Sequence, residues 1–517
     1  MSIRRLRNGI AALGFVGLSV VSASAAEPDV NPNATLIYFD AIGNQTMDPQ
    51  EPQNNSSFAQ GVLMAVYDPL ILLNEVGEPT AGLAESWEYN ADLTVFTMKL
   101  RPNVTFHDGT KFNASVVARN FERSFSIGSK AGAATLETLS QIAAVETEGD
   151  WIVRLKLKAP SGQMPYLLGF QAGMMISPAA FGDNAFGAAV KPIGTGPYRV
   201  RTFESNVKTL TTRNDSYWGG IAGRPVAFEH HFVPDSRARL NAVRSGQANL
   251  ALIEGRQISE AKNAGFTVQV NEKNSTWEVQ ANFSRDNVGK LKVRQAIMHA
   301  IDRPALAEAL GFGASKPTVQ LFASSSPVYV SELENLYPFD QVKAKRLLAE
   351  VGYPNGVDIT WLLLNTNEYK QIGEAVQSML GEVGIRIKFD IIDVSQFYTF
   401  RRPPQRGDIL MVRWGGRPDP LQTFQETSGS TAVPWGAAVP EIDTLIAEAR
   451  GMDPADSRRL GVLHRLARVT TEQVSHISLM TRSSVYAFKP GCIVNLPPYL
   501  PTGNDRINDT KIGAKCK

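Results

Sequence analysis

The histidines are the residues best suited to metal binding or proton transfer, and they form no catalytic pattern. Two of them, His230 and His231, are adjacent, and neighbouring side chains on a strand point to opposite faces, so they cannot hold one metal together. The spacings of zinc hydrolases, serine hydrolases and phosphate loops do not occur. The full set is His107, His230, His231, His299, His464 and His476. We therefore expect no catalytic residue, no metal site and no cofactor, and predict that the protein is not an enzyme.

Two short segments have the composition of a binding site. The first, Asn44, Gln45 and Thr46, follows an apolar stretch at 36–39. The second, Trp414, Gly415, Gly416 and Arg417, follows a stretch at 408–412. Trp414 can offer an apolar platform, and the glycines allow a ligand to approach the backbone. The alternatives are a core tryptophan and glycines that only form a turn.

The elements that would position these segments are strands of an open α/β sheet. Both segments follow a predicted strand, and ligands of such sheets bind beyond the carboxyl ends of the strands. From about residue 276 the hydrophobic pattern alternates between the period of a strand and the period of a helix. A strand at 359–364, a helix at 368–383 and a strand at 385–392 predict a parallel crossover. Asp302 and Asp340 each precede a helical pattern as N-caps.

The first 26 residues predict export. Three arginines, Arg4, Arg5 and Arg7, precede an apolar core at 9–21 and small residues at 23–26. The core is too short to span a membrane, and no cysteine near the cleavage point suggests a lipid anchor. Removing this segment, which has no acidic residue, changes the formal charge from +2 to −1. That balance disfavours nucleic acid as a partner.

The chain has two cysteines, Cys492 and Cys516, close to its C-terminus. In an oxidising compartment a disulfide between them is the favoured interpretation. Metal ligation is the alternative, but no histidine cluster accompanies the pair.

Several motifs, in order and spacing, resemble one family. They are Leu83-Ala-Glu-Ser-Trp87, Phe106-His-Asp-Gly109, Gly194-Thr-Gly-Pro-Tyr198 and the N-x-x-Y-W turn Asn214 to Trp218. In these motifs the chain resembles the periplasmic solute-binding proteins of peptide-, opine- and nickel-type ABC importers, called family 5. The resemblance implies an α/β fold of the two-lobed periplasmic binding protein type (cluster C, three domains), with the ligand cleft between the lobes.

The resemblance also implies a domain plan. We expect a signal peptide at 1–26 and a lobe I core made of 27–72, 181–275 and 482–517. An insertion domain at 73–180 would pack on lobe I, and 276–481 would form lobe II. Hinge strands are expected near 274–282 and 480–488.

Arg417 departs from the family pattern. Peptide-binding relatives resemble W-x-x-D here, where the acid receives the peptide's amino terminus, whereas this chain reads W-G-G-R. A guanidinium repels an ammonium and holds carboxylates well. The alternative is that Arg417 points away from the cleft or pairs with Asp419, which otherwise resembles a turn cap.

The predicted function is that of a periplasmic solute-binding component of an ABC importer, for short peptides or peptide-like solutes. Its partners would be that ligand and the inner-membrane permease subunits with their ATPases, and the protein itself would be a monomer without a membrane anchor. Alternatives are a receptor for an opine, a glutathione-like or a sugar-conjugate anion, and a periplasmic peptide sensor that does not transport.

Overall fold

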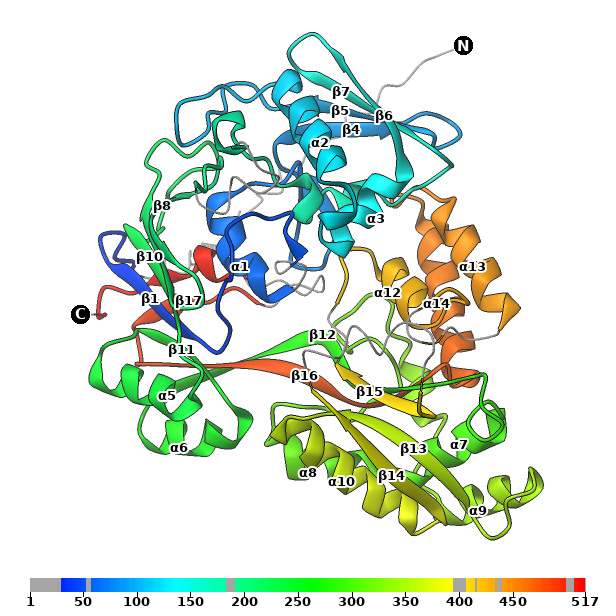
Figure 1. The fold of residues 1–517 in the computed structure, drawn as a ribbon. Helices are drawn as coiled ribbons and strands as arrows, with labels where there is room; N and C mark the ends of the chain where they lie inside the picture. Colours follow the sequence, from blue (N-terminus) through cyan, green and yellow to red (C-terminus); the bar gives the residue numbers. More distant parts are fainter. Residues whose placement is uncertain are drawn as a thin grey trace, which may run out of the picture.

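A ten-stranded sheet runs through both lobes (Figure 1). The computed structural model describes residues 29–52, 57–182, 191–393, 406–413, 416–432, 435, 439–498 and 506–516. In sheet order the strands are β14 (Ile385–Ile392), β13 (Val357–Leu364), β15 (Ile409–Arg413), β12 (Thr267–Ala281), β16 (His476–Phe488), β11 (Leu250–Ile253), β1 (Thr35–Asp40), β10 (Ala227–Phe232), β9 (Lys208–Arg213) and β8 (Tyr198–Glu204). The predicted two-lobed α/β class is confirmed by this sheet and by the structural comparisons below.

The antiparallel strands β12 and β16 pass from one lobe into the other, and we call them the hinge strands. Their pairing extends from Thr267 opposite Phe488 to Gln280 opposite His476. The register shifts between Lys273 and Thr276, near the middle of β12. The lobe I end of β16 lies beside β11, and the lobe II end of β12 lies beside β15.

Lobe I has helices on both faces of its half of the sheet. The alternation of β1 directs Leu36 and Tyr38 toward α1 (Ser57–Val66), and Ile37 and Phe39 toward α5 (Ser236–Ser245) and α6 (Ile258–Asn263). A short C-terminal ribbon, β17 (Ile493–Asn495) with β18 (Lys511–Ile512), completes this lobe.

The insertion domain is a four-stranded antiparallel sheet with its own core. Its strand order is β4 (Ala84–Tyr89), β5 (Val95–Leu100), β7 (Ile152–Leu157) and β6 (Ile142–Glu148), and a separate hairpin, β2 (Ile71–Leu73) with β3 (Pro79–Ala81), precedes it. Helices α2 (Ala114–Ile127), α3 (Ala133–Gln141) and α4 (Met164–Leu167) accompany the sheet. Asn113 caps α2 by accepting from the Val116 amide.

One buried carboxylate of lobe I collects several of the motif residues. Asp68 is 3% exposed and accepts hydrogen bonds from Thr195 Oγ1, Tyr217 OH and Trp218 Nε1. Burial raises the pKa of Asp68, and three donors offset the cost of burying the carboxylate. Arg101 of the insertion domain also lies 4.6 Å from the Trp218 ring. These motifs therefore serve the scaffold.

Lobe II contains the predicted crossover. β13 and β14 pair in parallel, with α10 (Asn367–Gly381) between them in the chain, which confirms the prediction. Helices α7 (Leu291–Ala300), α8 (Arg303–Gly311) and α9 (Gln341–Glu350) also contribute to lobe II, and Asp302 and Asp340 cap α8 and α9 as expected. A second cluster is built from α12 (Pro420–Thr427), α13 (Pro440–Arg450) and α14 (Ser457–Glu472). No helix among the described residues is long and apolar enough to cross a membrane.

Candidate solute site between the lobes

A cavity of about 500 Å³ lies between the two lobes, on the face of the hinge strands that carries Trp277 and Met480. Lobe I contributes Ala41 and Ile42, just beyond the carboxyl end of β1, and the segment after β11. Lobe II contributes the C-terminal end of α8, the first turn of α10 and the carboxyl end of β15. The cavity is thus at the strand ends where open α/β sheets bind ligands.

The charged side chains that line this cavity are mostly basic. Two carboxylates line it, Glu254 and Glu368, against the five cations Arg239, Arg256, Lys273, Arg413 and Arg482. The surplus of positive charge favours a solute with carboxylate groups.

The cations of the cavity differ in their surroundings. Arg239 donates to the main-chain carbonyls of Leu252, Val233 and Pro234. Its guanidinium therefore holds the end of β11 and the segment after β10 together. Arg482 lies on β16, 5.4 Å from the Trp277 ring, and donates to Ser275 Oγ. Lys273 is 5% exposed, whereas Arg413 at the end of β15 is exposed.

The segment predicted from Asn44, Gln45 and Thr46 is irregular in backbone and follows Ala41 and Ile42 in the chain. Asn44 and Thr46 are buried, and their oxygens accept from the amides of Asn206 and Asp48. Gln45 is exposed, and its carbonyl accepts from Ser205 Oγ. The cavity lining contains Ala41 and Ile42 instead, so a solute contact by residues 44–46 stays a prediction.

In the second predicted segment, Trp414 and Gly415 lie outside the described residues. Gly416 is buried, and the Arg417 side chain is 23% exposed. Arg417 Nε and Nη2 donate to the two Glu426 oxygens at 2.8 and 2.5 Å. Its ion pair is therefore with α12 rather than with Asp419, and its role toward a solute stays a prediction.

Asp419 is a helix cap in a buried ion pair. Its side chain accepts from the Leu421 amide at the start of α12 and is fully buried. Arg459 Nη2 donates to both carboxylate oxygens, at 2.9 and 2.7 Å, and Gln163 Nε2 of the insertion domain donates at 3.1 Å.

The insertion domain contacts lobe II directly at this point. Gln422 Nε2 donates to Glu137 Oε2 at 2.8 Å, and the Gly162 amide donates to the Arg450 carbonyl at 2.9 Å. Burial, together with the nearby Glu426 carboxylate, raises the pKa of Glu137 to about 7. Two acids, Glu137 and Glu426, therefore lie near each other at this contact, and Arg417 pairs with Glu426.

Sequence reasoning missed the hinge cations. Lys273 and Arg482 stand opposite each other in the β12–β16 ladder, within segments whose pattern predicts hinge strands. Two long basic side chains at neighbouring positions of a predicted interlobe crossing were the available signal. Among the described residues no group of three or more His, Cys, Asp or Glu side chains is arranged to hold a metal.

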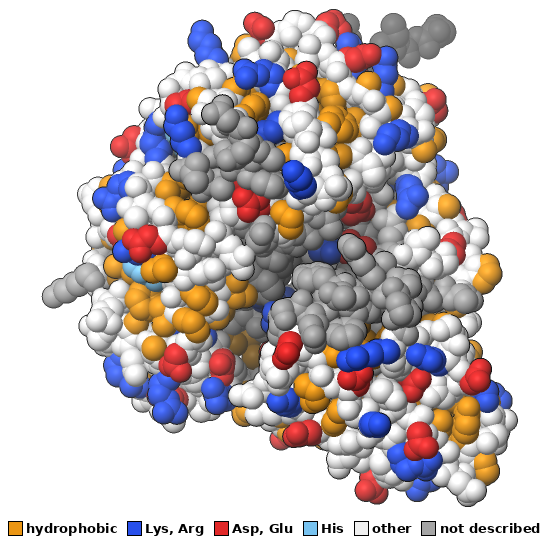
Figure 2. All heavy atoms as spheres, viewed as in Figure 1, with side chains coloured by type: hydrophobic (Ala, Val, Ile, Leu, Met, Phe, Trp, Pro, Cys, Tyr) orange, Lys and Arg blue, Asp and Glu red, His pale blue; other side chains and the backbone are white. Residues whose placement is uncertain are grey.

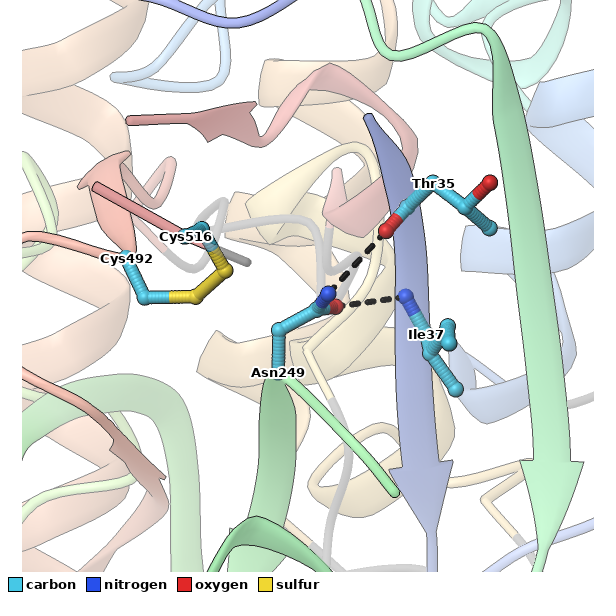
Figure 3. The surroundings of a disulfide bond; sticks show 5 residues. All are labelled: Thr35, Ile37, Asn249, Cys492 and Cys516. Carbon is cyan, nitrogen blue, oxygen red and sulfur yellow. Dashed lines mark hydrogen bonds between the residues drawn. A yellow bond between two sulfur atoms is a disulfide. The ribbon is translucent and has the colours of Figure 1, made fainter. Parts of the chain in front are cut away.

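Cys492 and Cys516 form a disulfide, 24 residues apart in sequence (Figure 3). It joins the residue before β17 to the segment after β18. In the same view, Asn249 donates to the Thr35 carbonyl at 3.0 Å and accepts from the Ile37 amide at 2.6 Å. The two Asn249 hydrogen bonds hold the residue before β11 against β1.

Two lobes joined by two hinge strands, with a charged cavity between them, define a solute-binding protein. The family model described as bacterial extracellular solute-binding proteins, family 5 (middle) matches residues 78–434. The chain belongs to this family, whose members are solute receptors of ABC importers.

The chain is also similar to named relatives. It is 29% identical over 403 residues to the glutathione-binding protein GsiB of Shigella dysenteriae, covering 75% of this chain and 74% of that protein. NikA of Brucella suis in complex with Fe(III)-EDTA is 25% identical with a TM-score of 0.80, over 93% of this chain and 100% of NikA. AgaA of A. tumefaciens R10 with agropinic acid is 24% identical with a TM-score of 0.76, over 93% and 99% of the two chains.

Proposed function

We propose that this protein is the periplasmic receptor of an ABC importer for short peptides or peptide-like solutes that carry carboxylate groups. The single observation that carries the solute class is the surplus of cations in the interlobe cavity. Lys273, Arg413 and Arg482 line it in addition to Arg239, which donates to main-chain carbonyls, and Arg256, which pairs with Glu254. A carboxylate that enters this cavity gains charge-assisted hydrogen bonds. The names of relatives that bind glutathione and agropinic acid agree with such a solute.

The mechanism is a shift between open and closed forms. A solute that contacts both lobes binds the closed form better and moves the equilibrium toward it. The hinge strands β12 and β16 supply the bending point, and the contact between Glu137 and Gln422 forms across the closing surfaces. The permease subunits and their ATPases would then recognise the closed receptor.

The remaining parts of the proposal concern export and organisation. Residues 1–26 would direct export and be removed, leaving a monomer in the periplasm without a membrane anchor. The domain boundaries given above belong to the proposal. The outer surface drawn in Figure 2 mixes Lys and Arg with Asp and Glu, which fits a freely diffusing receptor better than one that binds a polyanion.

A thermal-shift panel followed by calorimetry tests this function. Glutathione, trialanine, an opine and a sugar phosphate are each titrated into the mature protein, and a true solute raises the melting temperature with concentration. We expect Arg413→Gln to weaken a carboxylate solute about 10- to 100-fold, since hydrogen bonds to charged groups contribute roughly 1.5–3 kcal/mol. The control is Arg346→Gln on α9, which lies outside the cavity lining.

Two results would contradict the proposal. One is the absence of any stabilising carboxylate solute, and the other is equal affinity in Arg413→Gln and the wild type. Uptake of labelled solute by cells with and without the gene separates a transport receptor from a sensor.

A further inference from the structure

The turn that ends α8 brings an aromatic side chain of lobe II to the cavity, where it meets the main chain of lobe I. Phe312 in this turn and Gly255 of lobe I, which follows β11, both line the cavity. A Cβ added at Gly255 would lie 3.2 Å from the Gly311 carbonyl oxygen and 3.4 Å from Phe312 Cβ. Figure 1 shows α6 of lobe I and α8 of lobe II below the hinge strands. Phe312 therefore lies where the two lobes touch beside the solute site.

The residues just after Phe312 are anchored, so the position of its ring is fixed. Ser483 Oγ of β16 donates to the Ala314 carbonyl. The Ala314 side chain packs against the lobe I cluster that includes Leu240, Ile253 and Ile258. A residue held by contacts on the strand and on lobe I can present its side chain to a solute without first being ordered.

The backbone of Phe312 is in a conformation that suits glycine and disfavours an aromatic residue. Its φ is +51°, in the left-handed region, and Gly313 follows with a φ of +77°. Glycine is the usual residue at such a helix end, because it has no Cβ to clash with the backbone. A large side chain that is kept at a strained position is characteristic of functional sites, where the strain is offset by what the side chain does.

The Phe312 side chain is also accessible from the cavity. It is 49% exposed, and of the exposed large hydrophobic side chains in the part of the chain that the structure describes, it is the one that lines the cavity. An exposed hydrophobic residue is common by itself. Here the exposure, the strained backbone and the place in the cavity coincide at one residue. An apolar group of a solute that covers this ring gains free energy in proportion to the area removed from water.

We infer that Phe312 is a specificity-determining residue of the solute site, whose ring covers an apolar group of the solute against lobe I. This inference rests on the proposed function and adds a second feature to the solute class. The cations of the cavity hold the carboxylate, and Phe312 selects solutes that carry an alkyl or thioether group on the same molecule. Such a solute contacts lobe II through the ring and lies beside the main chain of Gly255 in lobe I, so it joins the two lobes.

Calorimetry of the mature protein with two pairs of probes tests this inference. The pairs are triglycine with trialanine, and glutathione with S-methylglutathione, and each pair differs only in methyl groups. We expect the wild type to prefer the methylated member by about 4-fold for each methyl group that the ring covers. Phe312→Gly should lose this preference, whereas Phe312→Tyr, which retains the ring, should keep it. The melting temperature of solute-free Phe312→Gly should be unchanged or higher, because glycine adopts the positive φ without strain.

The matched control is Phe339→Gly, which removes a ring that is 46% exposed on lobe II, lies outside the cavity lining and has no positive φ. This variant should keep the wild-type preference. If the wild type binds both members of each pair equally, or if Phe312→Gly keeps the preference, the inference is wrong while the proposed function stands. A lower melting temperature of solute-free Phe312→Gly would assign the ring to the fold and would also overturn the inference. If no probe binds the wild type, the inference and the proposed function fail together.

Discussion

A Glu278→Gln variant on β12 should change the pH dependence of stability in the absence of any solute. Burial raises the pKa of Glu278 from 4.5 to about 8 in the folded protein. Between these values the folded state binds a proton that the unfolded state has released, so stability falls as pH rises. The slope is about 1.4 kcal/mol per pH unit, which amounts to about 4 kcal/mol from pH 5 to pH 8.

Glutamine at this position cannot ionise, so the variant should lack this loss. Urea unfolding at pH 5, 6, 7 and 8 gives the free energy of unfolding of both proteins. We expect near-equal stability at pH 5 and an advantage for the variant that grows toward pH 8. Glu350→Gln should run parallel to the wild type over the same range, because the pKa of Glu350 is lowered rather than raised. Parallel curves for wild type and Glu278→Gln would refute the assignment of Glu278 as a buried neutral acid.

Three further changes test other contacts. Arg459→Met should lower the free energy of unfolding by about 3–5 kcal/mol, since it leaves a buried carboxylate without its cation; urea denaturation measures this, and a loss under 1 kcal/mol would contradict it. Reducing the disulfide between Cys492 and Cys516 should lower the free energy of unfolding of lobe I by about 3 kcal/mol, because the bond closes a loop with a sequence separation of 24 residues. Denaturation with and without reductant measures this loss, and coincident curves would contradict the prediction. Gly162→Ala should weaken solute binding while leaving each lobe folded. The new methyl group would lie 1.8 Å from the Met452 carbonyl oxygen, across the contact between the insertion domain and lobe II. Unchanged affinity by calorimetry would show that this contact does not accompany closure.

Local pattern was enough to predict the elements of lobe II. Asp302 and Asp340 cap helices because a short acceptor side chain before an apolar period satisfies free amides, and this depends on neighbours in sequence alone. The β13–α10–β14 unit follows from the change of hydrophobic period. Such features need no knowledge of distant partners.

Contacts between distant segments could not be predicted in the same way. The motif residues Tyr217 and Trp218 were recognisable, but their acceptor Asp68 lies 149 and 150 residues away. Arg417 stands out in the sequence as a departure from the family pattern, but its partner Glu426 lies two turns into the next helix, where the sequence gives no sign of the pairing.

The buried polar side chains of β12 show the same limit. The alternation of Thr276, Glu278 and Gln280 in a predicted hinge segment was visible in the sequence. An alternating strand normally places its polar side chains in water. Their burial depends on packing within lobe II, which a linear pattern does not report.

The central claim is that the basic interlobe cavity binds the carboxylate of a peptide-like solute. The most direct test is calorimetry of the wild-type mature protein with trialanine and with trialanine amide, which differ only at the carboxyl end. We predict that the free carboxylate binds at least 10-fold more tightly, and that the difference shrinks in Arg413→Gln. Equal affinity of the two peptides for the wild type would contradict the claim.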